Sequence, residues 1–228
     1  MADPAPLALI VGAGPGIGRG FATALAADGY RVALASRHPD TLDAWARPLG
    51  AHGFAVDAGD RASIVALFDA VDRALGAPDV VLYNPSARVR GELLSLDADA
   101  ALQAVRVTAL GAFVAAQEAA RRMLPRGRGA LFFTGATAGV KGFARSSVFA
   151  MGKFALRGLA QSLARELGPQ GIHVVHFVID GAVQGDDGDA RGDRLTPSTI
   201  AASYMAALRQ PAGAWSWEIE LRSKDEAF

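Results

Sequence analysis

The sequence contains no cysteine and no excess of charge of either sign. Its 228 residues include 23 Lys and Arg and 23 Asp and Glu, so the formal net charge is zero. The absence of cysteine excludes disulfide bonds, thiolate metal sites and cysteine nucleophiles. Because balanced charge gives no strongly basic field, we expect neither nucleic acid nor a membrane as a partner.

The sequence also lacks a long hydrophobic run near its start. Residues 1–6 have no basic stretch, and the apolar run that follows ends in glycines after a few residues. This segment is too short to span a bilayer and has the wrong flanks for a signal peptide. We therefore expect a cytoplasmic protein. With 51% hydrophobic residues, residues 1–228 are sufficient to bury the core of a single dinucleotide-binding domain.

Short apolar runs alternate with longer amphipathic segments, a pattern typical of βαβ units. Strands are expected at 7–12, 31–36, 53–57, 79–84, 130–134, 172–179 and 215–221. Helices are expected at 16–28, 61–75, 97–123, 147–167 and 197–209, with a short helix after Asp40 and a loop at 180–195. The pattern predicts an α/β fold, a single Rossmann-type doubly wound parallel sheet of about seven strands flanked by helices.

A glycine-rich motif separates the first expected strand from the first expected helix. It reads Gly12-Ala13-Gly14-Pro15-Gly16-Ile17-Gly18. Glycines permit a tight turn and let backbone N–H groups approach a pyrophosphate at a helix N-terminus. A glycine-rich turn without a ligand is the alternative, but the strand–turn–helix context favours a dinucleotide site.

Three further positions follow expected strands on the same edge of the sheet. The second strand ends in Ser36-Arg37, where a carboxylate would hold the ribose hydroxyls of NAD. A hydroxyl and a guanidinium suit a 2′-phosphate, so NADP(H) is favoured over NAD(H), although Arg37 could also be an ordinary surface residue. Asp57 could accept a hydrogen bond from the adenine amino group, and Asn84 ends the fourth strand.

With Phe149-x3-Lys153 and Gly181, these landmarks resemble the short-chain dehydrogenase/reductase family over nearly the whole chain. The resemblance implies hydride transfer between a nicotinamide cofactor and a small-molecule substrate. It also implies a set of cofactor-binding residues: Gly12, Gly14, Pro15, Gly16, Ile17, Gly18, Ser36, Arg37, Asp57, Asn84, Lys153, Gly181 and Val183.

The chain departs from the family's catalytic pattern at three of four positions. Phe149 stands where the family has its proton-donating tyrosine, and Ala136 stands where it has a serine. Thr108 falls near the position of an asparagine that supports a water relay, and only Lys153 is retained. General acid catalysis contributes about 10²–10⁴ in rate, so these losses predict slow reduction of ordinary ketones.

Several side chains could substitute for the missing groups. Thr137 could point its hydroxyl toward the nicotinamide, or could simply be a β-branched residue at a strand end. Lys153 could act as an acid if burial lowered its pKa. The other hydroxyl groups near the site, which are more typical of core or capping positions, belong to Tyr83, Ser86, Ser146, Ser147 and Tyr204.

No metal site is expected. His38, His52, His173 and His176 show no ligand spacing, and the carboxylates Asp186, Asp187, Asp189 and Asp193, with Arg191 and Arg194, fit a mobile lid or solvated loop better than a metal site.

Three functional hypotheses remain open. The first is an NADP(H)-dependent oxidoreductase with a non-standard acid/base site, acting on activated carbonyls or imines. The second is a catalytically degenerate cofactor sensor or a structural subunit, and the third is lyase or isomerase chemistry on the same fold. The alanine-rich stretch 109–120, the tryptophans at 215 and 217 and the family's habit favour a homodimer or homotetramer.

Overall fold

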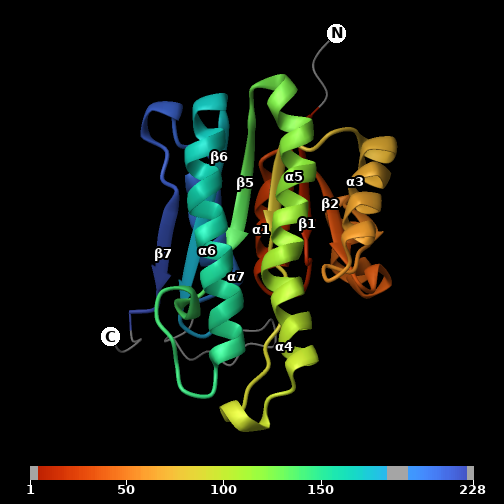
Figure 1. Cartoon of the computed structure of the whole chain (residues 1–228). Helices are drawn as coiled ribbons and strands as arrows, with labels where there is room; N and C mark the ends of the chain where they lie inside the picture. The colour runs from red at the N-terminus through yellow and green to blue at the C-terminus, as the bar shows by residue number, and fades with distance from the viewer. Residues whose placement is uncertain (1–4, 184–194, 225–228) are drawn as a thin grey trace.

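A twisted sheet of parallel strands forms the centre of the molecule in a computed structural model that describes residues 5–183 and 195–224 (Figure 1). Within these residues the strand order is β3-β2-β1-β4-β5-β6-β7, with every neighbouring pair parallel. The strands are β1 (Leu7–Val11), β2 (Arg31–Ser36), β3 (His52–Ala55), β4 (Val80–Tyr83), β5 (Gly129–Thr134), β6 (Ile172–Asp180) and β7 (Glu218–Arg222). The predicted Rossmann-type fold class is confirmed.

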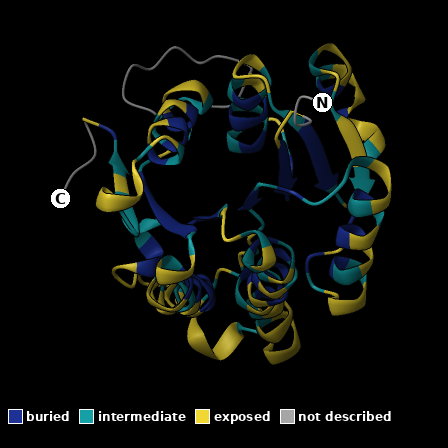
Figure 2. Cartoon of the chain, turned by 90° about the horizontal axis from the view of Figure 1, so that it is seen from above, coloured by how far each residue is buried: buried dark blue, intermediate teal, exposed yellow. Residues whose placement is uncertain are grey.

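Helices cover both faces of the sheet, as the view from above shows (Figure 2). One layer contains α3 (Arg61–Leu75), α4 (Ala98–Val105), α5 (Gly111–Met123) and α6 (Ser147–Leu167). The other contains α1 (Ile17–Ala27), the short α2 (Asp43–Ala46) and α7 (Pro197–Leu208). The inner strands are buried on both faces, which explains their continuous apolar sequences.

Local capping signals place several helix ends as predicted. The Asp60 carboxylate accepts a hydrogen bond from the backbone N–H of Ala62 at 2.9 Å, and α3 ends at Gly76 with φ of +95°. Asp97 caps α4 in the same way, accepting from the backbone N–H of Ala100 at 2.7 Å. These bonds satisfy N–H groups that a helix leaves unpaired.

Two expected elements differ from the structure. The predicted helix 97–123 is continuous in space, but Arg106–Leu110 form a π-helical segment between α4 and α5. The last strand begins at Glu218 rather than at 215. Trp215 is held outside the sheet because its indole stacks on the His173 ring at 4.7 Å and donates a hydrogen bond to the carbonyl oxygen of Gln210.

The combined helix Ala98–Arg126 is long and apolar enough to cross a membrane by length and composition alone. Its small buried residues, including Ala112, Ala115 and Ala119, pack in the core against α3 and the sheet. Core packing accounts for about a third of its most apolar window, which is 33% buried, while Leu102, Leu110 and Phe113 are exposed.

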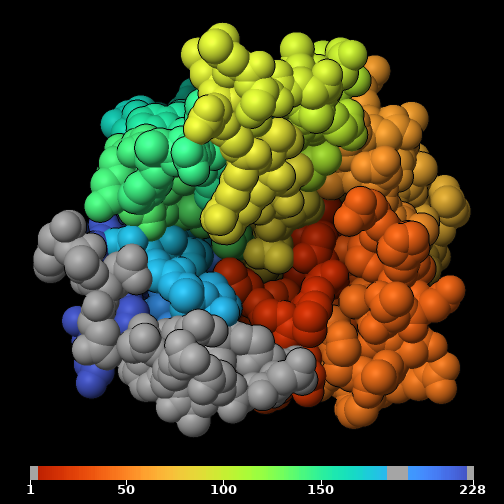
Figure 3. Space-filling model, turned by 90° about the horizontal axis from the view of Figure 1, so that it is seen from below, coloured from red at the N-terminus to blue at the C-terminus, as the bar shows by residue number. Residues whose placement is uncertain are grey.

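The carboxyl ends of the strands meet at the lower edge of the sheet in Figure 1. Seen from that edge, the molecule is hollowed between the glycine loop after β1, the segment leading into α4 and the end of β6 (Figure 3). The strand order reverses between β1 and β4 at this point. Ligands of open α/β sheets bind at such reversals.

Candidate functional site

The loop between β1 and α1 uses its glycines in different ways. At Gly12, φ is +76° and a Cβ atom would lie 2.7 Å from the ring of Pro85, so conformation and space both exclude a side chain. At Gly18 a Cβ atom would lie 3.2 Å from the backbone of the preceding turn. Gly14 and Gly16 have no atom within 4 Å of a Cβ position. These two therefore border open space at the N-terminus of α1, where an anion is favoured.

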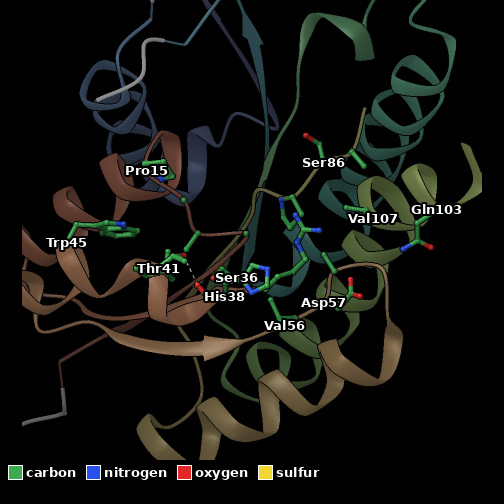
Figure 4. Close-up of a pocket in the computed structure, with 18 residues that line it drawn as sticks. Pro15, Ser36, His38, Thr41, Trp45, Val56, Asp57, Ser86, Gln103 and Val107 are labelled. Carbon is green, nitrogen blue, oxygen red and sulfur yellow. Dashed lines mark hydrogen bonds between the residues drawn. The ribbon is translucent and has the colours of Figure 1, made fainter. Parts of the chain in front are cut away.

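A cavity of about 700 Å³ lies beside this loop. Figure 4 shows Ser36, Asp57 and Trp45 around it. The Ser36 Oγ atom is buried and has no hydrogen-bond partner in the described part of the chain. Arg37 lines the same cavity. A buried hydroxyl without a described partner and a guanidinium that lines the same cavity can both donate hydrogen bonds to an anion.

Asp57 and Asn84 hold the backbone around the cavity. The Asp57 Oδ1 atom accepts a hydrogen bond from the backbone N–H of Gly59 at 2.8 Å, and the side chain remains exposed. Asn84 donates from Nδ2 to the carbonyl oxygen of Gly12 at 2.9 Å. Asn84 therefore braces the glycine turn from the neighbouring strand.

A second cavity, of about 610 Å³, adjoins the first, because Gly14 and Ser86 line both, and the two together are called the groove. Lys153 lines this second cavity, is 2% exposed, and donates from Nζ to the carbonyl oxygen of Thr134 at 2.6 Å. Burial, and to a smaller extent the charge of Arg88, lower the pKa of Lys153 to about 7. An amine in this state can exchange a proton near neutral pH.

Phe149 lies between two cations. Its ring is 6% exposed, with the Cζ atom of Arg88 at 4.3 Å from the ring centroid and the Nζ atom of Lys153 at 5.8 Å. These distances lie within the range of cation–π attraction. Phe149 therefore contacts two positive groups near the cavity through its ring, and it has no proton to donate.

Ala136 and Thr137 follow β5 at the border of a third cavity, which also touches Phe149. Ala136 contributes no polar side-chain atom. The Thr137 hydroxyl donates to Asp180 Oδ1 at 2.5 Å. Asp180 is 5% exposed and is also bound by Arg222. Thr137 is therefore oriented by a buried, ion-paired carboxylate.

Thr108 lies in the π-helical segment Arg106–Leu110 and is 1% exposed. Its Oγ1 atom accepts a hydrogen bond from the backbone N–H of Ala87 at 3.1 Å, and its side chain packs closely against Gly152 of α6. The hydroxyl thus fixes the loop after β4. Single-turn π segments often occur at functional sites.

Gly181 and Val183 line the second cavity at the end of β6. Gly181 has φ of +139°, which favours glycine, and Val183 forms a parallel bridge to Leu195. The remaining candidates at this edge, Pro15 and Ile17, also line the groove.

The tyrosines considered as proton donors lie in the core. Tyr83 is fully buried and donates its hydroxyl to the carbonyl oxygen of Val107 at 2.5 Å. Tyr204 is fully buried, stacks on Phe177 with ring centroids 3.9 Å apart, and shares a hydrogen bond with Thr134 Oγ1. Burial raises the pKa of both hydroxyls further above the usual range. Neither tyrosine is placed to exchange a proton in the groove.

The carboxylates and arginines considered for the 186–194 segment lie outside the described residues. Within 5–183 and 195–224, no three His, Asp or Glu side chains gather as a metal ion would require. His173 and His176 are buried on β6, where His176 Nδ1 binds Glu218 at 3.0 Å. Burial lowers the pKa of His176 to about 4, so it is neutral near pH 7.

Sequence reasoning missed Trp45, Arg88 and Gln103, which line the groove, and Asp180, which lines the third cavity. The sequence does place two arginines, Arg88 and Arg90, within six residues of Asn84, in the segment that follows β4. Their position in a loop without regular structure gave no periodicity to place them.

Comparisons with known proteins agree on one family. Residues 6–186 match the short chain dehydrogenase family. The chain is 27% identical to the 3-oxoacyl-[acyl-carrier-protein] reductase MabA of Mycobacterium tuberculosis, over 96% of this chain and 86% of that protein. It is 29% identical to the glycine betaine reductase ATRR of Emericella nidulans, of which it spans only 19% of the length while 96% of this chain is covered.

Solved structures show the same architecture. A short-chain dehydrogenase from Rhodopseudomonas palustris superposes with a TM-score of 0.84 at 32% sequence identity, covering 95% of this chain and 98% of the other. The similarity therefore extends over nearly the whole of both chains.

Proposed function

Because this chain belongs to the short-chain dehydrogenase/reductase family of oxidoreductases, we propose that it is an NADP(H)-dependent oxidoreductase with a non-standard acid/base site. The observation that carries the cofactor preference is the pair at the end of β2. Ser36 Oγ is buried without a hydrogen-bond partner among the described residues, and Arg37 lines the same cavity, which adjoins the cavity that holds Lys153. A 2′-phosphate would satisfy both side chains.

Different residues of the groove would contact different parts of the cofactor. Gly14 and Gly16 leave room for the pyrophosphate, and Asp57 is accessible to the adenine. Asn84, Lys153, Gly181 and Val183 border the cavity that would receive the nicotinamide ribose and ring. When bound, NADPH supplies a hydride from C4 of the nicotinamide.

Lys153 is our proposed proton donor. It is the titratable side chain that lines the nicotinamide end with a pKa near 7. Its ammonium form can donate a proton to the alkoxide that forms from a carbonyl, or to the amine nitrogen that forms from an imine. Thr137, oriented by Asp180, is the second candidate. Since neither matches a tyrosine–serine pair, we propose activated carbonyls or imines as substrates, because they need less protonation.

A cofactor sensor or structural subunit is the second candidate function. Phe149 and Ala136 favour it, because both catalytic hydroxyls of the family are replaced while the groove is preserved. NADPH binding without turnover on any carbonyl or imine would select this function over the first.

The test begins with fluorescence titration of NADPH and NADH. We expect NADPH to bind more tightly, and Arg37→Gln to weaken NADPH about tenfold or more while leaving NADH binding unchanged. Arg128→Gln is the matched control, because Arg128 is exposed at the start of β5, at the opposite edge of the sheet. If Arg37→Gln lowered the affinity for NADPH and for NADH by the same factor, a contact between Arg37 and the 2′-phosphate would be refuted.

Turnover is then measured across pH with activated carbonyls and imines. If Lys153 donates the proton, kcat/KM for reduction falls as pH rises above about 7. A flat profile between pH 6 and 9 excludes Lys153 as the donor. Lys153→Met should lower kcat, whereas Thr137→Val tests the second candidate.

The whole chain acts, in our proposal, as one cytoplasmic domain that forms a homodimer or homotetramer. Large apolar side chains are exposed on neighbouring helices: Leu110 and Phe113 are 52% and 43% exposed, and Met151 and Phe154 on α6 are 59% and 44% exposed. Burial of such residues drives association. Phe113→Glu with Phe154→Glu should give a monomer by light scattering, and an unchanged mass would exclude this surface.

A further inference from the structure

The third cavity lies next to the proposed nicotinamide position, beside the carboxyl ends of β5 and β6. It has a volume of about 700 Å³ and shares Arg88, Ala136 and Phe149 with the cavity that contains Lys153. A substrate must occupy this space for its reacting atom to approach the nicotinamide end of the groove.

Positive side chains surround this cavity. Among the described residues, its lining includes four cationic residues, Arg88, Arg90, Lys141 and Arg145, and one carboxylate, Asp180. Arg145 is paired with Glu92 at 2.8 Å outside the cavity. Asp180 is already bound by Arg222 and by the Thr137 hydroxyl. The acid in the lining therefore does not neutralise the remaining three cations.

Arg88, Arg90 and Lys141 have no carboxylate partner among residues 5–183 and 195–224. The Arg88 guanidinium lies over the Phe149 ring, and Lys141 Nζ lies 5.5 Å from the ring centroid of Phe143. Aromatic faces hold both cations in place but provide no hydrogen-bond acceptors. Their N–H groups thus remain available to a ligand.

The surroundings of Arg88 make an anion favourable there. Partial burial, and the charge of Arg90, lower the pKa of the Arg88 guanidinium. A negatively charged ligand would relieve the repulsion among these cations and accept charge-assisted hydrogen bonds. A cationic substrate would be repelled, and a neutral one would leave the repulsion unchanged.

We propose that Arg88, Arg90 and Lys141 form an anion subsite that holds an acid group of the substrate, a carboxylate or a phosphate, beside its reacting carbon. Arg88 is the central residue, because it borders both the substrate cavity and the nicotinamide cavity. This subsite deepens the proposed function, since it identifies the substrate as an anionic carbonyl or imine compound.

Binding is tested first without turnover. Malonate and methyl phosphate are titrated into the full chain by calorimetry, with dimethyl malonate as the neutral comparison. We expect at least one anion to bind and the diester not to bind; the tighter of the two anions identifies the acid group. Arg88→Gln should weaken binding about 10- to 100-fold, and Arg88→Lys, which retains charge without the planar fork, should weaken it less.

Two controls locate the anion. Arg128→Gln removes an equal charge outside the groove and should leave the affinity unchanged, whereas a loss of methyl phosphate binding in Arg37→Gln would place that anion in the adenosine cavity instead. Circular dichroism and thermal unfolding confirm that Arg88→Gln is folded. The inference is overturned if neither anion binds the wild-type protein, or if Arg88→Gln binds as tightly as wild type.

NADPH titration separates this inference from the proposed function. Arg88-dependent anion binding without NADPH binding would leave the subsite standing and refute the cofactor proposal. NADPH binding without anion binding would refute the anion subsite and leave the cofactor proposal standing. With an active substrate, Arg88→Gln should raise KM for a keto acid about tenfold or more, but not for its methyl ester. An equal rise in KM for the keto acid and for its methyl ester would contradict a contact specific to the acid group.

Discussion

Replacement of Lys153 by methionine should stabilise the cofactor-free protein at acidic pH. Lys153 is 2% exposed, has no carboxylate in contact among the described residues, and has a pKa lowered from 10.5 to about 7 by burial and then by Arg88. This lowering of the pKa corresponds to a cost of roughly 5 kcal/mol in the free energy of unfolding when the buried lysine is charged. Loss of the hydrogen bond to Thr134 offsets about 1–3 kcal/mol of this. We expect a net gain of about 2–4 kcal/mol in the free energy of unfolding at pH 6.

The pH dependence gives the stronger test. Between about pH 7 and 10.5 the unfolded wild-type chain keeps the lysine proton that the folded state has released, so the stability of the wild type rises with pH. The free-energy cost of burying Lys153 is fully present below pH 7 and disappears as the pH approaches 10.5. The advantage of the methionine variant should therefore shrink by about 1.4 kcal/mol per pH unit across this window.

Urea unfolding followed by tryptophan fluorescence at pH 6, 7, 8 and 9 measures the effect. Lys141→Met is the control, because Lys141 is exposed and its removal should not change stability in this pH-dependent way. A difference between Lys153→Met and wild type that stays constant with pH would refute a lowered lysine pKa. A variant that is less stable at every pH would show that the hydrogen bond outweighs the burial of charge.

Four other variants test separate parts of the structure. Gly14→Ala should fold with unchanged stability but lose NADPH affinity about tenfold or more, whereas Gly12→Ala should lose about 1–3 kcal/mol of unfolding free energy by urea titration. Retained NADPH binding in the first contradicts our placement of the pyrophosphate. Phe149→Tyr with Ala136→Ser should raise ketone reduction about 10²-fold or more; no gain means that further groups are missing. Tyr204→Phe should cost about 1 kcal/mol without changing KM, since its hydroxyl is bonded in the core.

Most of the fold was predictable because its signals are local or periodic. The apolar run of β4 is buried on both faces, as its sequence indicated, and Asp60 and Asp97 cap the helices that follow them. The start of β7 was not predictable, because the stacking of Trp215 on His173 joins segments far apart in the sequence. The π-helical turn around Thr108 likewise depends on packing against α6.

The candidate site was predictable in part. The glycine loop and Lys153 follow fixed spacings, and the structure brings them to one groove. Arg88 carries no spacing signal, since its position depends on the path of a loop and on the aromatic ring that it contacts. Hydrogen bonds such as that from Thr137 to Asp180 depend on how β5 and β6 pair, which the sequence pattern does not specify.

Phe149, at the position where the family resemblance leads us to expect a tyrosine, does more than leave out a proton donor. The ring attracts cations through its face, and both Arg88 and Lys153 lie within cation–π distance of it. Arg88 in turn lowers the pKa of Lys153, after the larger effect of burial. The Phe149 ring thus contacts both Lys153, which is suited to donate a proton, and Arg88, which is suited to bind an anion. If this arrangement supports catalysis, Arg88→Gln should shift the falling limb of the kcat/KM profile to higher pH, because removal of a neighbouring positive charge raises the pKa of Lys153. An unshifted profile would show that Arg88 and Lys153 act independently.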